Sequence, residues 1–276
     1  NQEENLLPNL SELALANLNF SHTDTLGGAR QVKVDKENTT IVEGKGEPGD
    51  IEKLETEFKN KGGEKAVFSL SAARADYIAE AFARFSRSLT RAARCEAYYK
   101  ETNALRTLSN VLEKEYRLGI IRYAASYDKE AKEMLESKNL TCELIAEFRA
   151  RITISKTSPL ALSDEIKESD LANYTEVAYG DPYVPSVSLT EIKKEELPEG
   201  AERRIFVFER AGALRLVAEN EEAYMFASPL SEATLSRYDL VQRVCKSPKK
   251  IYRDVLVYPE FKTRLEEKLR SEVKEG

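Results

Sequence analysis

The stretch GGARQVKVDKENTTIVEGKGE, residues 27–47, has the pattern of two short β-strands joined by a polar turn. Val32 and Val34 alternate with polar Gln31 and Lys33, so one face of the first strand can be buried. The turn falls at residues 36–38, and the second strand runs into glycines at 44 and 46. The stretch therefore predicts a β-hairpin with strands at 31–34 and 40–42.

Bulk composition narrows the class of protein around this hairpin. The 276 residues are 41% hydrophobic and 33% charged, with a net charge of −6, which argues against general affinity for nucleic acid. Cys95, Cys142 and Cys245 are odd in number and far apart, which favours a reducing intracellular compartment. His22 is the single histidine, and one histidine without nearby cysteines is unlike a metal site. No apolar run is long enough to span a membrane.

The segment after the hairpin predicts long helices. Residues 64–118 contain neither glycine nor proline, and one apolar stripe follows helical spacing through Ile78, Phe82, Phe85, Leu89 and Ala92. The patterns predict further helices at 102–118, 128–137 and 141–152. Near the C-terminus they predict strands at 204–209, 214–218 and 223–227, and then helices at 231–245 and 259–273.

Two stretches resemble group I chaperonin subunits, and together they span about residues 26–93. LGGARQVKVDKENTTIVEGKG, residues 26–46, is similar to the end of the apical domain in that family. GGEKAVFSLSAARADYIAEAFARFSRSLTRAA, residues 62–93, is similar to the intermediate-domain strand and long helix. The resemblance implies that the chain descends from a chaperonin gene.

The ATPase parts of that family are missing. We find no Gly-Asp-Gly-Thr phosphate loop, which would give backbone N–H groups to the phosphates of a nucleotide. The resemblance places the catalytic aspartate near residues 86–87, where Arg87 can neither bind Mg²⁺ nor activate water. The resemblance therefore does not extend to ATP hydrolysis, and we expect no enzyme activity and no cofactor.

The sequence predicts an α+β fold, with a mostly helical elongated body, a chaperonin-like β-hairpin near the N-terminus and a small C-terminal antiparallel β module. Residues 1–63 are expected to hold the hairpin and a helix, and residues 64–158 the long helices. Residues 159–200 are acidic and rich in loop-forming residues, which is typical of an extended connector. Residues 201–276 then form the C-terminal α+β module.

Six residues are candidates for contacts with a partner protein. A basic stripe at helical spacing either docks onto an acidic surface or is a solvated face with local ion pairs; it consists of Arg84, Arg87, Arg91 and Arg94. Tyr179 and Tyr183 lie in the proline-containing stretch YGDPYVPS, which either follows a partner's groove or packs on its own chain.

Cys95 is a weak candidate for carrying a cofactor. Arg94 before it and two tyrosines shortly after it loosely resemble the chromophore segments of phycobiliproteins, although the Arg-Asp that follows the cysteine there is absent. The alternative is a buried structural thiol.

These observations predict a non-enzymatic structural or assembly protein, a scaffold or linker that contacts other proteins in a large complex. A more specific interpretation is a linker of a photosynthetic antenna of the phycobilisome type, in the plastid stroma. The alternative is a chaperone-like protein that binds clients without ATP. Both interpretations involve no nucleic acid and no membrane span.

Overall fold

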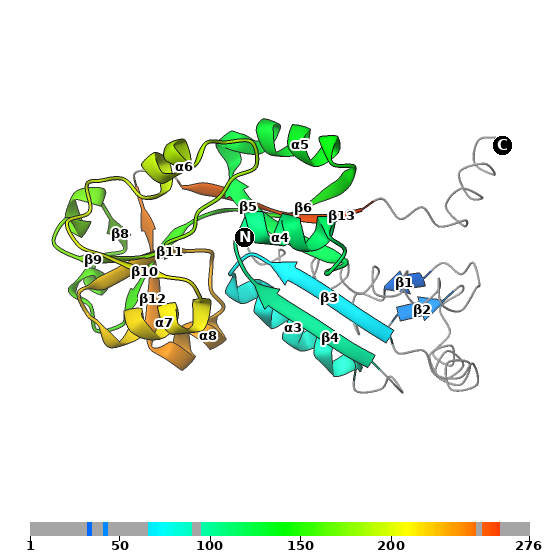
Figure 1. Cartoon of the computed structure of the whole chain (residues 1–276). Helices are drawn as coiled ribbons and strands as arrows, with labels where there is room; N and C mark the ends of the chain where they lie inside the picture. Colours follow the sequence, from blue (N-terminus) through cyan, green and yellow to red (C-terminus); the bar gives the residue numbers. More distant parts are fainter. Residues whose placement is uncertain (1–31, 35–40, 44–65, 90–94, 247–249, 260–276) are drawn as a thin grey trace.

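The computed structural model describes residues 32–34, 41–43, 66–89, 95–246 and 250–259 of the chain. Strands β1 (Val32–Val34) and β2 (Ile41–Glu43) pair antiparallel, as the sequence predicts for the hairpin. The other described strands form two separate sheets, each with its own helices, so the main body has two lobes (Figure 1).

A five-stranded sheet in the order β4-β3-β5-β13-β6 forms lobe 1. β3 runs parallel to β4 and β5, because α3 and α4 carry the chain back between these strands, whereas β13 is antiparallel to β5 and β6. Lobe 1 consists of β3 (Ala66–Ala72), α3 (Asp76–Leu89), β4 (Cys95–Glu101), α4 (Ala104–Leu112), β5 (Leu118–Ala124), the 3-10 turn η2 (Ala125–Tyr127), α5 (Asp128–Ser137), β6 (Leu140–Arg149) and β13 (Ile251–Pro259).

Helices cover both faces of the lobe 1 sheet. The apolar stripe of α3 places Ile78 and Phe85 in a core with Ile120 of β5. On the other face, α4 and α5 contribute Val111 and Leu135 to a second core. The central strands are therefore buried on both sides, and their ends are the places where polar side chains can gather.

A six-stranded sheet in the order β10-β9-β11-β7-β12-β8 forms lobe 2. β9 is parallel to β10 and β11, and β7 is antiparallel to β11 and β12. Lobe 2 consists of β7 (Arg151–Ser155), η3 (Pro159–Leu162), β8 (Glu165–Ile166), η4 (Glu168–Leu171), β9 (Thr175–Tyr179), α6 (Leu189–Glu196), β10 (Arg204–Val207), α7 (Arg210–Glu219), β11 (Ala223–Ala227), α8 (Glu232–Tyr238) and β12 (Leu240–Cys245).

The strands of the two sheets are connected through two neighbouring segments. β6 continues into β7 through Ala150, and the chain returns from β12 to β13 past Lys250. The backbone N–H of Ala150 donates to the carbonyl of Lys250 at 2.8 Å, so the two crossing segments are hydrogen-bonded to each other. α6 follows lobe 2 strands in sequence, yet its Ile192 packs in the core of lobe 1.

The predicted fold class is wrong. The described body is a two-lobed α/β structure built on two sheets, with no long helical hairpin in it. Residues 141–152, predicted as a helix, form most of β6 and the start of β7. Ile145 faces a register shift between Asp254 and Val255 of β13, so Ile145 and Ala146 are both buried and the strand alternation is interrupted.

Of the other predicted helices and strands, some are confirmed and some are wrong. The helix at 128–137 and the strand at 223–227 are confirmed as α5 and β11. The strand predicted at 214–218 lies inside α7, and the helix predicted at 231–245 is α8 followed by β12. The predicted long helical region is not continuous, because α3 ends at Leu89 and the next described element is the strand β4. None of the described helices has the length and apolar character needed to span a membrane.

Candidate functional site

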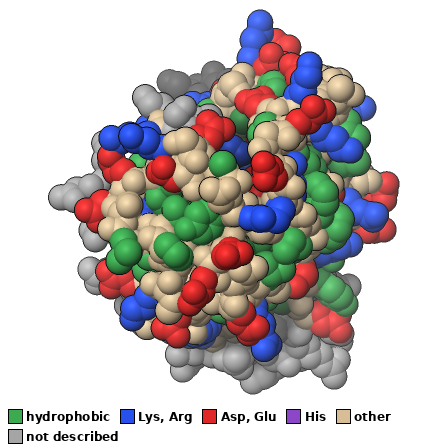
Figure 2. All heavy atoms as spheres, turned by 90° about the vertical axis from the view of Figure 1, so that its left-hand side faces the viewer, with side chains coloured by type: hydrophobic (Ala, Val, Ile, Leu, Met, Phe, Trp, Pro, Cys, Tyr) green, Lys and Arg blue, Asp and Glu red, His purple; other side chains and the backbone are tan. Residues whose placement is uncertain are grey.

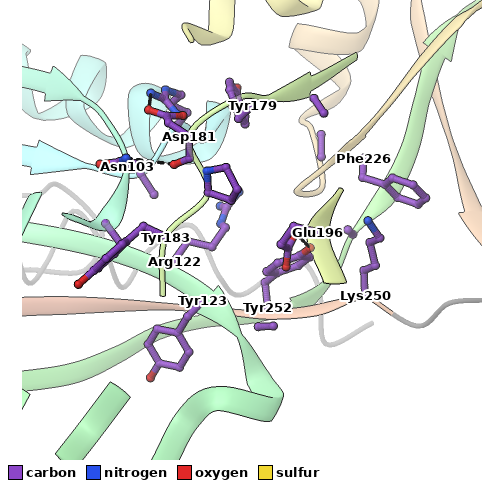
Figure 3. Close-up of a pocket in the computed structure, with 18 of the residues that line it drawn as sticks. Asn103, Arg122, Tyr123, Tyr179, Asp181, Tyr183, Glu196, Phe226, Lys250 and Tyr252 are labelled. Carbon is purple, nitrogen blue, oxygen red and sulfur yellow. Dashed lines mark hydrogen bonds and ion pairs between the residues drawn. The ribbon is translucent and has the colours of Figure 1, made fainter. Parts of the chain in front are cut away.

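A cavity of about 180 Å³ lies between the two lobes, beside the two crossing segments. Lobe 1 supplies the turn between β3 and α3, the start of α4 and the end of β5. Lobe 2 supplies β9, the segment that follows it, and the end of β11. In Figure 3, Asn103 and Asp181 lie on one side of the cavity, and Glu196, Phe226 and Lys250 lie on the other.

Arg74 and Asp181 form a two-point ion pair at one side of this cavity. Nη1 and Nη2 of Arg74 each donate to a carboxylate oxygen of Asp181 at 2.8 Å. The guanidinium also lies over the ring of Tyr179, 4.7 Å from its centre. The Arg74 side chain is only 8% exposed, and its Nε finds no hydrogen-bond partner among the described residues. One donor of a buried cation is therefore left unmet.

The neighbouring backbone is fixed by the start of α4. Asn103 caps this helix, because its Oδ1 accepts from the N–H of Arg106 at 2.9 Å. Its Nδ2 donates to the backbone carbonyl of Asp181 at 3.0 Å. Asn103 of lobe 1 therefore holds the backbone of Asp181, while the Asp181 carboxylate is held by Arg74 alone among the described residues.

Arg122 lies between the two sides of the cavity in Figure 3. Its Nε and Nη2 donate to the fully buried Asp254 at 2.7 Å, and its guanidinium lies 4.7 Å from the ring centre of Phe148. The hydroxyl of Tyr77 donates to the same carboxylate. Burial, the largest single influence, would lower the pKa of Arg122, but the charge of Asp254, the hydrogen bonds to it and the neighbouring tyrosines together outweigh burial and raise it, so Arg122 stays a cation.

Lys250 and Glu196 are the charged residues on the side of the cavity that lies opposite Asp181. The Lys250 ammonium lies 4.4 Å from the ring centre of Phe226 and has no carboxylate within ion-pair distance in the described part of the chain. The Tyr252 hydroxyl donates to Glu196 at 2.6 Å. Burial raises the pKa of Glu196, although Tyr252 and Lys250 oppose the shift. This side of the cavity therefore offers a cation with no ion-pair partner among the described residues and a carboxyl that binds its proton more tightly than usual.

A set of polar contacts, here called the inter-lobe latch, joins the lobes away from the cavity. Arg210, the first residue of α7, donates to Asp76 at 2.7 Å and to Glu101 at 2.9 Å. Thr234 of α8 donates to Asp76 at 2.6 Å. The latch consists of Asp76, Glu80, Glu101, Arg210, Ser231 and Thr234. The positive ends of α7 and α8 thus face carboxylates of lobe 1.

The predicted site residues are dispersed. Tyr179 and Tyr183, for which the sequence allows either contact with a partner protein or packing on their own chain, both line the cavity. Arg84 and Arg87 lie on α3, and Arg87 is exposed. Arg91 and Arg94 lie outside the described residues, as does His22, and of Cys95 the structure describes only that it begins β4.

No pattern in the sequence singles out the charged side chains of the cavity, above all Arg74, Asp181 and Lys250. The one available signal is an arginine between small residues in SAARAD, directly before the helix that begins at Asp76. A lone arginine at a helix start has many ordinary roles, so the pattern alone does not single it out.

The side chains that line the cavity indicate which chemistry it can support. Among the described residues there is no group of three histidine, cysteine or acidic side chains that could hold a metal ion. Cys142 lies on β6, where burial raises the pKa of its thiol, which opposes formation of a reactive thiolate. What the cavity presents is paired and unpaired cations, aromatic rings and a carboxyl, which suits recognition of a polar small molecule.

The outer surface of lobe 2 adds little to this site. Figure 2 faces this lobe and shows acidic and basic side chains interspersed, with hydrophobic side chains in patches between them. Ile205, Phe206 and Phe208, on or just after the edge strand β10, are 37%, 52% and 61% exposed. The described side chains of this face form no continuous basic patch in this view.

Comparison with known proteins agrees with the two-lobed arrangement. No family model matches the sequence. The reduced form of the regulatory domain of OxyR2 from Vibrio vulnificus aligns with a TM-score of 0.50 at 12% identity, covering 75% of this chain and 92% of that one. The chain shares the fold of that regulatory domain. The effector-binding domain of QuiR in complex with shikimate aligns with a TM-score of 0.49 at 13% identity, covering 75% and 95%.

The regulatory domain of MetR from N. meningitidis, described as a LysR family regulator, aligns with a TM-score of 0.46 at 14% identity, covering 72% of this chain and 86% of that one. The fold shared with the OxyR2 regulatory domain overturns the chaperonin resemblance as a guide to fold and function. Residues 66–101 form a parallel β-α-β unit of lobe 1, within a regulatory-domain fold. The interpretations as a scaffold, a phycobilisome linker in the plastid or an ATP-independent chaperone are therefore wrong.

Proposed function

We propose that this chain contains a ligand-sensing regulatory domain that is not an enzyme and that binds a small molecule in the cavity between its lobes. The observation that carries the proposal is the cavity itself, which both lobes line and which holds a buried arginine with an unmet donor. The fold shared with the OxyR2 regulatory domain supports a regulatory role.

The arrangement offers a physical route from binding to signal. A molecule in the cavity contacts the start of α4 in lobe 1 and β9 in lobe 2 at the same time. Such a ligand favours the lobe orientation in which both sets of contacts form, and it shifts the population toward that orientation. The crossing segments at Ala150 and Lys250 are the points about which the lobes would turn.

The described residues give no reason to assign a redox mechanism or a nucleic-acid contact to this part of the chain. Cys142 lies in lobe 1 and Cys245 is buried in lobe 2, and both are free thiols. Free thiols are compatible with the intracellular, reducing compartment that we propose for the chain.

A ligand screen with a cavity-filling variant tests the proposal. Metabolite mixtures are added to the full chain, and an increase in the melting temperature marks binding. Ala227→Phe at the end of β11 fills the cavity wall and should abolish every genuine shift. Ala172→Phe, at an exposed alanine of the same lobe, is the matched control and should retain the shift. Ligands that stabilise the Ala227→Phe variant as strongly as the unmodified chain would contradict the proposal.

A further inference from the structure

We propose that the ligand is a monocyclic carboxylic acid whose carboxylate replaces the side chain of Asp181 on Arg74. This inference rests on the proposed function and names the ligand class of the same cavity. Asp181 then acts as an internal substitute for the ligand, because it fills the anion position when the cavity is empty.

The geometry of Arg74 identifies the anion position. A guanidinium that is 8% exposed needs an anion, and the two parallel bonds of 2.8 Å to Asp181 are the contacts that a ligand carboxylate would make. The unpartnered Nε adds a third donor that Asp181 does not use. An incoming carboxylate with an adjacent hydroxyl or ring oxygen can satisfy Nε as well, which Asp181 does not.

The side chain of Asp181 can rotate away from Arg74 without unfolding a helix or a strand. Asp181 lies between β9 and α6, outside any helix or strand, and its side chain is 28% exposed. Asn103 holds its backbone carbonyl, so rotation of the side chain can vacate Arg74 while the backbone stays in place. The ion pair is therefore a reversible closure of the anion position.

The charges of the cavity wall also favour an anion. The wall contains three cations, Arg74, Arg122 and Lys250, and three acids, and Arg122 is already paired with the buried Asp254 behind the wall. Of the acids, Glu176 is paired with Arg204, and Glu196 accepts the hydroxyl of Tyr252. When Asp181 rotates away, neither Arg74 nor Lys250 has a carboxylate within ion-pair distance among the described residues, and a negatively charged ligand can take the vacated position on Arg74.

The size and walls of the cavity indicate a single ring. An apolar cavity of ~150 Å³ is known to hold benzene, so about 180 Å³ leaves room for one ring and small substituents. Aromatic side chains form the walls, with Tyr179 beside Arg74, Phe148 below Arg122 and Phe226 beside Lys250. A planar or nearly planar ring can stack on these faces while its carboxylate reaches Arg74.

Benzoate and benzamide, which share a ring but differ in charge, are the probes that test the proposal by calorimetric titration of the full chain. Benzoate should bind Asp181→Asn at least about tenfold more tightly than the unmodified chain, the factor expected if Asp181 occupies the anion position nine-tenths of the time. The Arg74→Gln/Asp181→Asn double variant, which keeps this contact neutral, should lose benzoate binding. Asp164→Asn, at an exposed aspartate of the same lobe, should change nothing.

The outcomes separate this proposal from the proposed function. Equal binding of benzamide and benzoate by Asp181→Asn, no benzoate binding by that variant at millimolar concentration, or an equal gain in Asp164→Asn would each overturn the carboxylic acid assignment. The assignment of the cavity as a ligand site would still be supported if Ala227→Phe abolishes the melting-temperature shifts that the screen hits cause. If the hits bound the Ala227→Phe variant as well as the unmodified chain, the proposed function would be wrong.

Discussion

Arg122 and Asp254 lie directly opposite each other on β5 and β13, and they form a two-point ion pair with both bonds at 2.7 Å. Asp254 is fully buried, and Tyr77 of α3 donates a further hydrogen bond to it. The pair therefore ties two central strands of lobe 1 to the helix that covers them. It also orients Arg122 toward the cavity.

Removing one partner of this pair should be costly. Asp254→Asn leaves the Arg122 guanidinium without its anion in a buried site, so we expect a loss of about 3–5 kcal/mol in the free energy of unfolding. The double variant Arg122→Gln/Asp254→Asn should lose less than the sum of the two single variants, because it removes both charges. Urea unfolding measures all three. Additive losses would show that the two side chains do not depend on each other.

The inter-lobe latch should resist separation of the lobes. Arg210→Met removes the bonds to Asp76 and Glu101 and leaves the buried Asp76 with Thr234 alone among its described partners. We expect a loss of about 1–3 kcal/mol and faster amide exchange at the starts of α7 and α8. Arg215→Met, which breaks a pair with Glu219 that is 75% and 67% exposed, is the control and should change stability by less than about 1 kcal/mol. Equal exchange in the two variants would contradict the role of the latch.

Local patterns could predict elements that are regular within themselves. α5 was predictable because residues 128–137 are a short amphipathic run with acidic residues in the first turn. β6 was not, because the register shift opposite Ile145 interrupts its alternation and imitates helical spacing. α7 was also missed, since its cap is Glu209, whose side chain accepts from Gly212, and glutamate is not a usual capping residue.

The site could not be predicted, because its contacts span the fold. Arg74 and Asp181 are 107 residues apart in the sequence, and Arg210 lies 134 residues from Asp76. Such pairs follow from the two-lobed topology and from no local pattern. The long similarity to chaperonins was misleading because helix-forming and strand-forming segments recur in unrelated folds, and the pairing of the strands decides which fold forms.

Gly119 on β5 should tolerate no side chain. A Cβ there would lie 2.8 Å from Cγ2 of Thr107 and of Val257, and 2.9 Å from Cγ2 of Val111. Gly119→Ala would push α4 away from the sheet, so we expect a loss of about 1–3 kcal/mol in the free energy of unfolding. Gly200→Ala is the control, because no atom lies within 4 Å of a Cβ at that position. A Gly119→Ala variant as stable as the control would show that α4 is loosely packed.

The stability of the chain should depend on pH through Glu196. Burial raises its pKa above the ordinary value of 4.5; Glu195 adds to the shift, while Tyr252, Lys250 and Arg122 oppose it. The folded chain therefore binds the proton more tightly than the unfolded chain. This contribution to stability is fully present below pH 4.5 and is lost as the pH rises through the raised pKa.

Glu196→Gln removes this titration. Relative to the unmodified chain, the variant should become progressively more stable as the pH rises from below 4.5 to neutral, because only the unmodified chain then has to hold a half-buried carboxylate. Glu199→Gln, at an exposed position three residues further on, should show no such trend. Urea unfolding at a series of pH values measures the difference. A constant difference between Glu196→Gln and the unmodified chain across that range would mean that Glu196 titrates alike in the folded and unfolded states.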